Sequence, residues 1–220
     1  MRKLLKLFLS FLLLIAVFSA AVAQPFSGEI AAFKKQDSLS FPPKNAILFV
    51  GSSSFTMWKD VQDYFPGYTI INRGFGGSTL PDVIYYVDEI IVPYHPKQIV
   101  IYCGENDLAS SDTVTAKDVF ERFKTLFQSI REKLPQVPVA YVSMKPSPSR
   151  ANLSEKMIQA NGWIKSFLAK QKKTAYIDVY TKMLGKDHKP RPELFLGDRL
   201  HMNKAGYTIW QKAIKPYLKR

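Results

Sequence analysis

Five short apolar runs recur along the chain, separated by longer segments of mixed polarity. Each run is continuous rather than alternating and is rich in Val, Ile, Phe and Tyr, which is typical of strands that are buried on both faces. The runs predict strands at 46–50, 68–72, 98–102, 139–143 and 175–179.

The segments between these runs carry apolar residues at helical spacing. The clearest case is 117–134, where Phe120, Phe123 and Phe127 fall on one side. The predicted helices are 29–36, 81–94, 117–134, 153–170 and 204–218. Because strands and helices alternate, we predict an α/β fold with a parallel sheet that carries helices on both faces.

The first residues have the pattern of an export signal. Arg2, Lys3 and Lys6 precede an apolar run that ends near Phe18, and residues 19–23 have the small-x-small spacing of a cleavage site. This pattern predicts a secretory signal peptide over 1–23, cut after Ala23, and a secreted or periplasmic protein. A transmembrane anchor is the alternative, but the run is shorter than the ~20 residues that span a bilayer.

Residues 24–220 would then be the mature protein, which we predict to be a single domain without a stable membrane anchor, because no repeat or long linker divides it. The whole chain has 220 residues, one cysteine and a net charge of +13. A lone cysteine excludes an internal disulfide and a Cys-rich zinc site. No other metal-ligand cluster is visible, so we expect no metal and no cofactor. The oligomeric state is not indicated.

A charge of +13 first suggests a nucleic-acid partner. Three of these charges lie in the predicted signal peptide, and the remaining basic residues are scattered, with no run of five and no zinc-finger spacing. We therefore expect a solvated basic surface and no nucleic-acid partner. A weak attraction to anionic envelope surfaces or acidic polysaccharides is compatible with this charge.

The loops that follow the strands are where chemistry is expected, because ligands bind outside the carboxyl ends of parallel strands. The first loop places Ser52, Ser53 and Ser54 after Gly51, at the start of a helix. The N–H groups and the dipole of a helix start favour a developing anion. A helix cap is the other interpretation of such serines, so this loop alone leaves nucleophile and cap open.

The next two loops add groups that can hold a ligand. Loop 72–78 contains three glycines, including Gly77, which permit a close approach of the backbone. A phosphate-binding loop is the alternative, but its G-x-x-x-x-G-K-[ST] pattern is absent. Loop 103–107 offers the Asn106 amide, and we predict Cys103 to be a buried small residue rather than a nucleophile.

The last loop holds Asp198 and His201, three residues apart and just before the final predicted helix. A turn of this length can bring the carboxylate to one imidazole nitrogen and leave the other nitrogen free for a serine. A structural hydrogen bond is the alternative. The other two histidines, His95 and His188, are predicted to lie on the surface.

In this order, the four loops resemble those of the GDSL or SGNH hydrolase superfamily, over about residues 46–218. That superfamily takes its name from four site residues, Ser, Gly, Asn and His. The resemblance implies a three-layer α/β/α sandwich with a five-stranded parallel sheet. It also implies a secreted bacterial esterase or lipase.

Carried onto this chain, the resemblance makes Ser53 the nucleophile, His201 the general base and Asp198 the carboxylate that orients it. It implies an oxyanion hole made by the backbone N–H groups of Ser53 and Gly77 and the side-chain amide of Asn106.

The first loop also departs from the family pattern. The Gly-Asp-Ser-Leu of the family reads Gly-Ser-Ser-Ser at 51–54, so Ser52 takes the aspartate position. With three successive serines, Ser54 is the alternative nucleophile.

We therefore expect a serine esterase that cleaves a small-molecule or glycan ester through an acyl-enzyme. Short acyl groups, such as acetyl on carbohydrate, are the expected substrates. A lysophospholipase or general acylesterase acting on lipids is the alternative enzyme. A non-catalytic secreted glycan-binding protein on a hydrolase fold is the alternative of another class.

Five basic residues lie in or beside loops that we expect around the leaving-group pocket, namely Arg73, Lys145, Arg150, Lys189 and Arg191. If their side chains face the cleft, a preference for anionic substrates such as acidic glycans is predicted.

Overall fold

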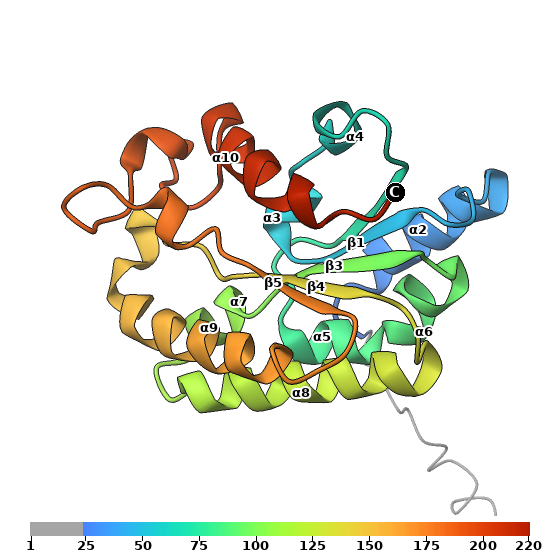
Figure 1. The fold of residues 1–220 in the computed structure, drawn as a ribbon, viewed down its shortest axis with the longest axis horizontal. Helices are drawn as coiled ribbons and strands as arrows, with labels where there is room; N and C mark the ends of the chain where they lie inside the picture. Colours follow the sequence, from blue (N-terminus) through green and yellow to red (C-terminus); the bar gives the residue numbers. More distant parts are fainter. Residues whose placement is uncertain (1–23) are drawn as a thin grey trace, which may run out of the picture.

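The computed structural model describes residues 24–220, so the predicted signal peptide lies outside the described residues. A five-stranded sheet with the order β2-β1-β3-β4-β5 runs through the molecule, and all of its pairings are parallel (Figure 1). The strands are β1 (Ile47–Gly51), β2 (Ile70–Gly74), β3 (Gln98–Tyr102), β4 (Val139–Val142) and β5 (Thr174–Ile177). The predicted α/β fold with a five-stranded parallel sheet is confirmed, and every strand boundary lies within two residues of its predicted position.

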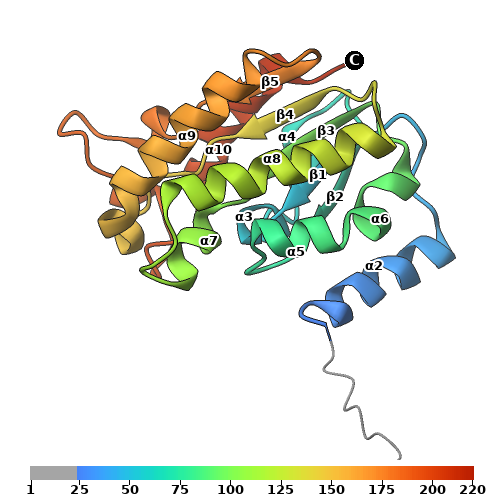
Figure 2. The ribbon, with the colours of Figure 1, turned by 90° about the horizontal axis from the view of Figure 1, so that it is seen from below.

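Helices cover both faces of the sheet. One face carries α2 (Ser27–Leu39), α5 (Leu80–Tyr85), α6 (Val87–Ile90), α8 (Ala116–Lys133) and α9 (Ser154–Leu168), and Figure 2 shows this face from below. The other face carries α3 (Ser53–Thr56), α4 (Val61–Tyr64) and α10 (Lys204–Ile214) (Figure 1). The short α7 (Glu105–Ser110) follows β3, and the 3₁₀ turns are η1 (Val92–Tyr94), η2 (Pro148–Leu153), η3 (Thr181–Met183), η4 (Pro192–Leu194) and η5 (Lys215–Tyr217).

Two apolar cores fill the spaces between the three layers. Successive side chains of a strand point to opposite faces, so Leu48 and Val50 belong to the core under α5 and α8, whereas Ile47 and Phe49 belong to the core under α10. Both faces of β1 are buried along its whole length, which explains why its sequence is a continuous apolar run.

Two predicted helices differ from the structure. The segment predicted as one helix over 81–94 is divided into α5, α6 and η1, because Tyr86 and Ile91 leave the helical conformation. The last helix ends at Ile214 rather than 218 and continues as the turn η5. Pro216 lies in that turn and has no N–H with which to extend the helical hydrogen bonds.

The direction of strand order reverses at β1, which lies between β2 and β3. At such a point the carboxyl ends of the two central strands open a crevice, here between β1 and β3. Gly51 ends β1 with a φ of 136°, and a Cβ there would lie 1.9 Å from the carbonyl oxygen of Tyr102 on β3. Only glycine lets the two strand ends come this close.

Candidate active site

Of the three serines that follow β1, only Ser53 is open to solvent and to another reactive group. It is the first residue of α3 and is half-buried, whereas Ser52 and Ser54 are 4% and 1% exposed. The Oγ of Ser54 has no hydrogen-bond partner within the described part of the chain. This burial and the absence of a base beside it argue against Ser54 as the nucleophile.

His201 connects Ser53 to Asp198. Its Nε2 lies 3.2 Å from the Oγ of Ser53, and its Nδ1 lies 2.6 Å from Oδ2 of Asp198. The other carboxylate oxygen of Asp198 accepts hydrogen bonds from the backbone N–H groups of Leu200 and His201, both at 2.9 Å. The structure therefore brings together the three residues that the sequence analysis expected to form a catalytic triad.

The surroundings of Asp198 keep its carboxylate ionised. Partial burial opposes the charge, but hydrogen bonds from the His201 ring and from the Leu200 and His201 amides lower the pKa of Asp198 to about 2. An ionised Asp198 accepts a hydrogen bond from the Nδ1–H of His201. This tautomer leaves Nε2 unprotonated and able to take a proton from Ser53.

The loop that carries this pair is tied to the start of α10. Asn203 caps that helix, since its Oδ1 accepts from the N–H groups of Ala205 at 2.9 Å and Gly206 at 3.3 Å. Its Nδ2 donates to the carbonyl of Glu193 at 2.9 Å, and the N–H of Leu196 donates to the carbonyl of His201 at 2.7 Å. These bonds connect the His201 loop to the start of α10 and to residues 193–196.

The groups expected to form an oxyanion hole come from the ends of β1, β2 and β3. Among the residues that the structure describes, no acceptor is bonded to the N–H of Ser53 or of Gly77. The Nδ2 of Asn106 donates to the Oγ of Ser52 at 2.6 Å and to the carbonyl of Ser78 at 3.0 Å. Asn106 is thus hydrogen-bonded to Ser52, which precedes Ser53, and to Ser78, which follows Gly77.

Asp107 is a buried carboxylate beside the site that the sequence analysis did not identify. It is fully buried, and its Oδ2 accepts from the N–H of Leu80 at 2.9 Å, while its Oδ1 accepts from Nη1 of Arg122 at 2.9 Å. It therefore links the Asn106 loop to the helix that follows the Gly77 loop. The sequence signal that could have identified it is the position of Asp107 directly after Asn106, in a loop that follows a buried strand.

The basic residues that the sequence placed around a pocket do not form one cationic lining. Arg73 is buried and pairs with Asp37 on the far side of β2, and Lys145 is buried against Glu105. The condition for a preference for anionic substrates is therefore not met by these two residues, because each cation is paired with a carboxylate inside the protein. Of the five, only Arg150 contacts a site residue: its Nη2 donates to Oδ1 of Asn106 at 2.9 Å.

Cys103 is the core residue that the sequence predicted. Its side chain is fully buried, and the Sγ lies 3.6 Å from the carbonyl of Ser78. Burial raises the pKa of the Cys103 thiol well above its usual value, which disfavours the reactive thiolate. His95 and His188 are exposed, as predicted. Residues 24–220 contain no group of three or more His, Cys, Asp or Glu side chains that could hold a metal ion.

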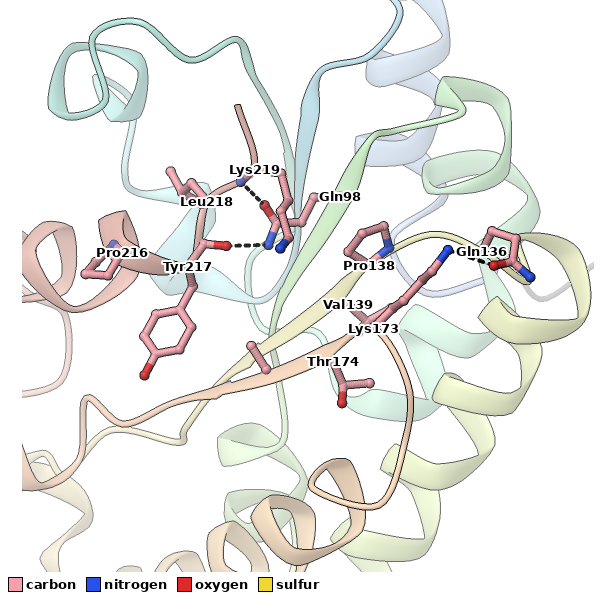
Figure 3. Close-up of a pocket in the computed structure, with 11 residues that line it drawn as sticks. Gln98, Gln136, Pro138, Val139, Lys173, Thr174, Pro216, Tyr217, Leu218 and Lys219 are labelled. Carbon is pink, nitrogen blue, oxygen red and sulfur yellow. Dashed lines mark hydrogen bonds between the residues drawn. The ribbon is translucent and has the colours of Figure 1, made fainter.

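A separate hollow of about 750 Å³ lies at the opposite end of the sheet, around the starts of β3, β4 and β5 (Figure 3). Its polar groups are already paired: Gln98 donates to the carbonyl of Tyr217 at 2.9 Å and accepts from the N–H of Lys219 at 2.8 Å, and Lys173 donates to Gln136 at 2.7 Å. We assign no reaction to this hollow, since none of the serine, histidine and carboxylate groups described above lines it.

Comparison with known proteins points to one family. The model of the GDSL-like lipase/acylhydrolase family matches residues 44–209. No protein with a curated description matches the chain. No helix in residues 24–220 has the length and apolar character needed to cross a membrane.

Three solved structures share the fold. A Streptococcus pneumonia protein named for platelet activating factor superposes with a TM-score of 0.77 at 20% identity, over 100% of both chains. A GDSL-like lipase from Bacteroides thetaiotaomicron gives a TM-score of 0.73 at 21% identity, over 86% of this chain and 96% of that one. A mutant of an acetyl-xylooligosaccharide esterase from a Geobacillus gives a TM-score of 0.61 at 16% identity, over 80% of this chain and 95% of that one.

Proposed function

Since this chain belongs to the GDSL-like lipase/acylhydrolase family and is therefore an ester hydrolase, we propose that it is a serine esterase with Ser53 as its nucleophile. The observation that carries this proposal is the continuous contact from Asp198 through His201 to Ser53, at 2.6 Å and 3.2 Å. The other two serines of the loop have no such contact.

The proposed reaction has two halves. In the first, Nε2 of His201 takes the hydroxyl proton of Ser53 as Oγ attacks the ester carbonyl, and the same nitrogen then protonates the leaving alcohol. In the second, His201 takes a proton from water, which attacks the acyl carbonyl, and then returns that proton to Oγ of Ser53 as the bond to the acyl group breaks and the acid leaves. Asp198 holds the imidazole in the required tautomer throughout.

The negative charge on the carbonyl oxygen needs donors that are in place before the reaction. We assign this task to the N–H groups of Ser53 and Gly77 and to the amide of Asn106. The two backbone N–H groups are free to donate to a ligand oxygen. The Asn106 Nδ2 would exchange one of its present acceptors, Ser52 Oγ or the Ser78 carbonyl, for that oxygen. One such donor typically contributes ~2.7–4 kcal/mol to lowering the barrier.

For the substrate, we propose short acyl esters of carbohydrate, above all acetyl esters. The support is analogy with the acetyl-xylooligosaccharide esterase of the same fold, which is a fold-level argument. Lipid esters are the second candidate, and one observation favours them. Met57 and Leu196 are 40% and 43% exposed, and their backbone N–H groups donate to the carbonyls of Ser53 and His201, so two exposed apolar residues are bonded to the backbone of site residues.

We further propose that residues 1–23 direct export and are removed after Ala23, which makes the protein secreted or periplasmic. The support is the order of basic, apolar and small residues in that segment. The mass of the protein recovered from the exporting cell tests this: the mature chain should begin at Gln24.

Acyl-chain profiling tests the substrate class. Rates are measured on nitrophenyl esters from acetyl to palmitoyl and on acetylated xylo-oligosaccharides, with Ser53→Ala as the control. We expect the highest kcat/KM on acetyl esters and release of acetate from the oligosaccharide. A maximum at eight or more carbons, with no release of acetate, would replace the carbohydrate proposal by the lipid one. Binding of glycans without any turnover would indicate the non-catalytic class instead.

A further inference from the structure

A chain of charged side chains runs from the protein interior to the Asn106 amide. The Nζ of Lys145 lies 2.7 Å from Oε2 of Glu105, and Nη1 of Arg150 lies 3.1 Å from Oε1 of the same carboxylate. The Nη2 of Arg150 then donates to Oδ1 of Asn106 at 2.9 Å. The side chains of Lys145 and Glu105 are 2% and 5% exposed, and that of Arg150 is 19% exposed. None of the three has a role in the reaction steps above.

The three linked side chains, Lys145, Glu105 and Arg150, carry two positive charges and one negative charge. Burial opposes ionisation of Glu105, but Lys145 and Arg150 outweigh it and hold the pKa of Glu105 below its usual value. The hydroxyl of Tyr102 also donates to this carboxylate. Glu105 is therefore a carboxylate between two cations, and Arg150 is the cation at the end nearest the reacting groups.

Stability alone is a weak explanation for this arrangement. Taking charged groups out of water costs several kcal/mol per ion, and an ion pair in the interior offsets only part of that cost. Apolar side chains of similar volume would fill the same space without the desolvation. The contact of the chain with Asn106 offers a functional explanation.

The contact with Arg150 decides which end of the Asn106 amide faces the nucleophile. A guanidinium only donates hydrogen bonds and stays protonated, whereas a side-chain amide has one accepting end and one donating end. With Oδ1 held by Arg150, Nδ2 lies on the other side and donates to Ser52, the neighbour of Ser53. If the amide turned over, two donors would face each other at Arg150.

We propose that Arg150 is a positioning residue for ester hydrolysis, which locks the Asn106 amide with its donor toward the oxyanion. Glu105 and Lys145 hold the guanidinium in place. This inference rests on the proposed function, because it assigns Arg150 a part in the same oxyanion hole. Its effect is on the transition state, where the oxyanion exists, and not on the bound ester.

A double-mutant cycle tests this assignment. The variants are Arg150→Met, Asn106→Ala and their combination, with Arg131→Met as the matched control, because Arg131 is a partly buried arginine that binds backbone carbonyls far from the site. The assay uses nitrophenyl acetate, which is uncharged. We expect Arg150→Met to lower kcat by about 10²-fold with KM changed by less than about threefold, as for loss of an oxyanion donor.

The combination separates a positioning role from a general one. If Arg150 acts through Asn106, the double variant is no slower than Asn106→Ala alone, because the energies of coupled residues do not add. Arg150→Lys, which keeps a cationic donor, should restore part of kcat, and it also serves if the Met variant does not fold. The affinity for a boronic acid that forms a tetrahedral anion on Ser53 should fall by the same factor as kcat/KM.

Three results would overturn the assignment. The first is an unchanged kcat in Arg150→Met. The second is a fall in kcat, when Arg150→Met is added to Asn106→Ala, by the same factor as in the wild type. The third is a kcat of Arg150→Lys no higher than that of Arg150→Met. The Ser53→Ala variant is included so that a wrong assignment of Arg150 can be distinguished from a wrong proposed function. Hydrolysis by Ser53→Ala at the wild-type rate would overturn the proposed function, whereas loss in Ser53→Ala with full activity in Arg150→Met overturns only the role of Arg150.

Discussion

The Nε2 of His201 lies 3.2 Å from the Oγ of Ser53, although the two residues are 148 positions apart in the sequence. Ser53 follows the first strand of the sheet, and His201 precedes the last long helix, which packs beside α3 on the same face. The parallel sheet brings these two loops to one edge, where the chain can assemble a site from residues that are distant in sequence.

Replacing Asp198 with Asn should greatly reduce activity without unfolding the protein. The Asn side chain can still bond to the His201 loop, but it can donate to Nδ1 and so favour the wrong imidazole tautomer. In proteins with this triad, the equivalent change lowers kcat by about 10⁴-fold. Because the Asp198 side chain is 47% exposed here, we expect a smaller loss of about 10²–10³-fold, read from kcat on nitrophenyl acetate. A loss of less than threefold would show that Asp198 does not orient His201.

The acid limb of the pH dependence should contain no contribution from Asp198. With a folded pKa of about 2, Asp198 stays ionised wherever the enzyme is active, so protonation of Asp198 should add no step to the acid limb of kcat/KM above pH ~4. The contribution of Asp198 to the free energy of unfolding depends on pH in the way usual for a carboxylate with a lowered pKa. The depressed pKa of Asp198 favours the folded state above pH ~4, and this contribution is lost as the pH falls toward about 2. An acid limb of slope two above pH 4 would contradict this account.

Alanine at Gly77 should cost both stability and activity. Gly77 has a φ of 85°, where a Cβ is strained by roughly 1–2 kcal/mol even though the nearest atom is 3.9 Å away. Relief of that strain would move the N–H that we assign to the oxyanion hole, so kcat should fall at least about tenfold.

Gly162→Ala is the matched control for that change. It lies in α9 without a positive φ and with no atom within 4 Å of the added Cβ, so it should stabilise the protein by about 0.5–1 kcal/mol and leave kcat unchanged. Thermal melts and initial rates of the two variants separate the effects. Equal kcat values in both would exclude a role for the Gly77 backbone.

Cys103 should be unreactive in the native protein. Burial raises the pKa of the thiol and removes it from solvent, so a chromogenic disulfide reagent should modify no cysteine until denaturant is added. One equivalent should then react, because the chain has one cysteine. Rapid native labelling with loss of activity would indicate an opening of the region beside Asn106 that the structure does not contain.

Much of the fold follows from local pattern in the sequence. Strand β3 occupies the predicted residues 98–102, because a continuous apolar run can be buried on both faces only in the middle of a sheet. The break at Tyr86 was not predictable, since the residues on either side of it keep helical apolar spacing.

The site was predictable mainly where a loop follows a strand. The positions of Ser53 and Asn106 follow from that rule together with the family resemblance, whereas His201 was identified from its spacing to Asp198 before the last helix and from the same resemblance. The chain of Lys145, Glu105 and Arg150 was missed, because it joins side chains that are 40 or more residues apart. Nothing local distinguishes Arg150, which turns toward Asn106, from Arg73, which is enclosed beside Asp37.

Identification of the residue modified by a fluorophosphonate tests the central claim most directly. The reagent is applied to the wild type, Ser53→Ala, Ser54→Ala and His201→Ala, and the adduct is located by peptide mass spectrometry. We predict one adduct, on Ser53, in the wild type and in Ser54→Ala, and none in Ser53→Ala or His201→Ala. An adduct on Ser54, or undiminished labelling of Ser53→Ala, would contradict the claim that Ser53 is the nucleophile of this esterase.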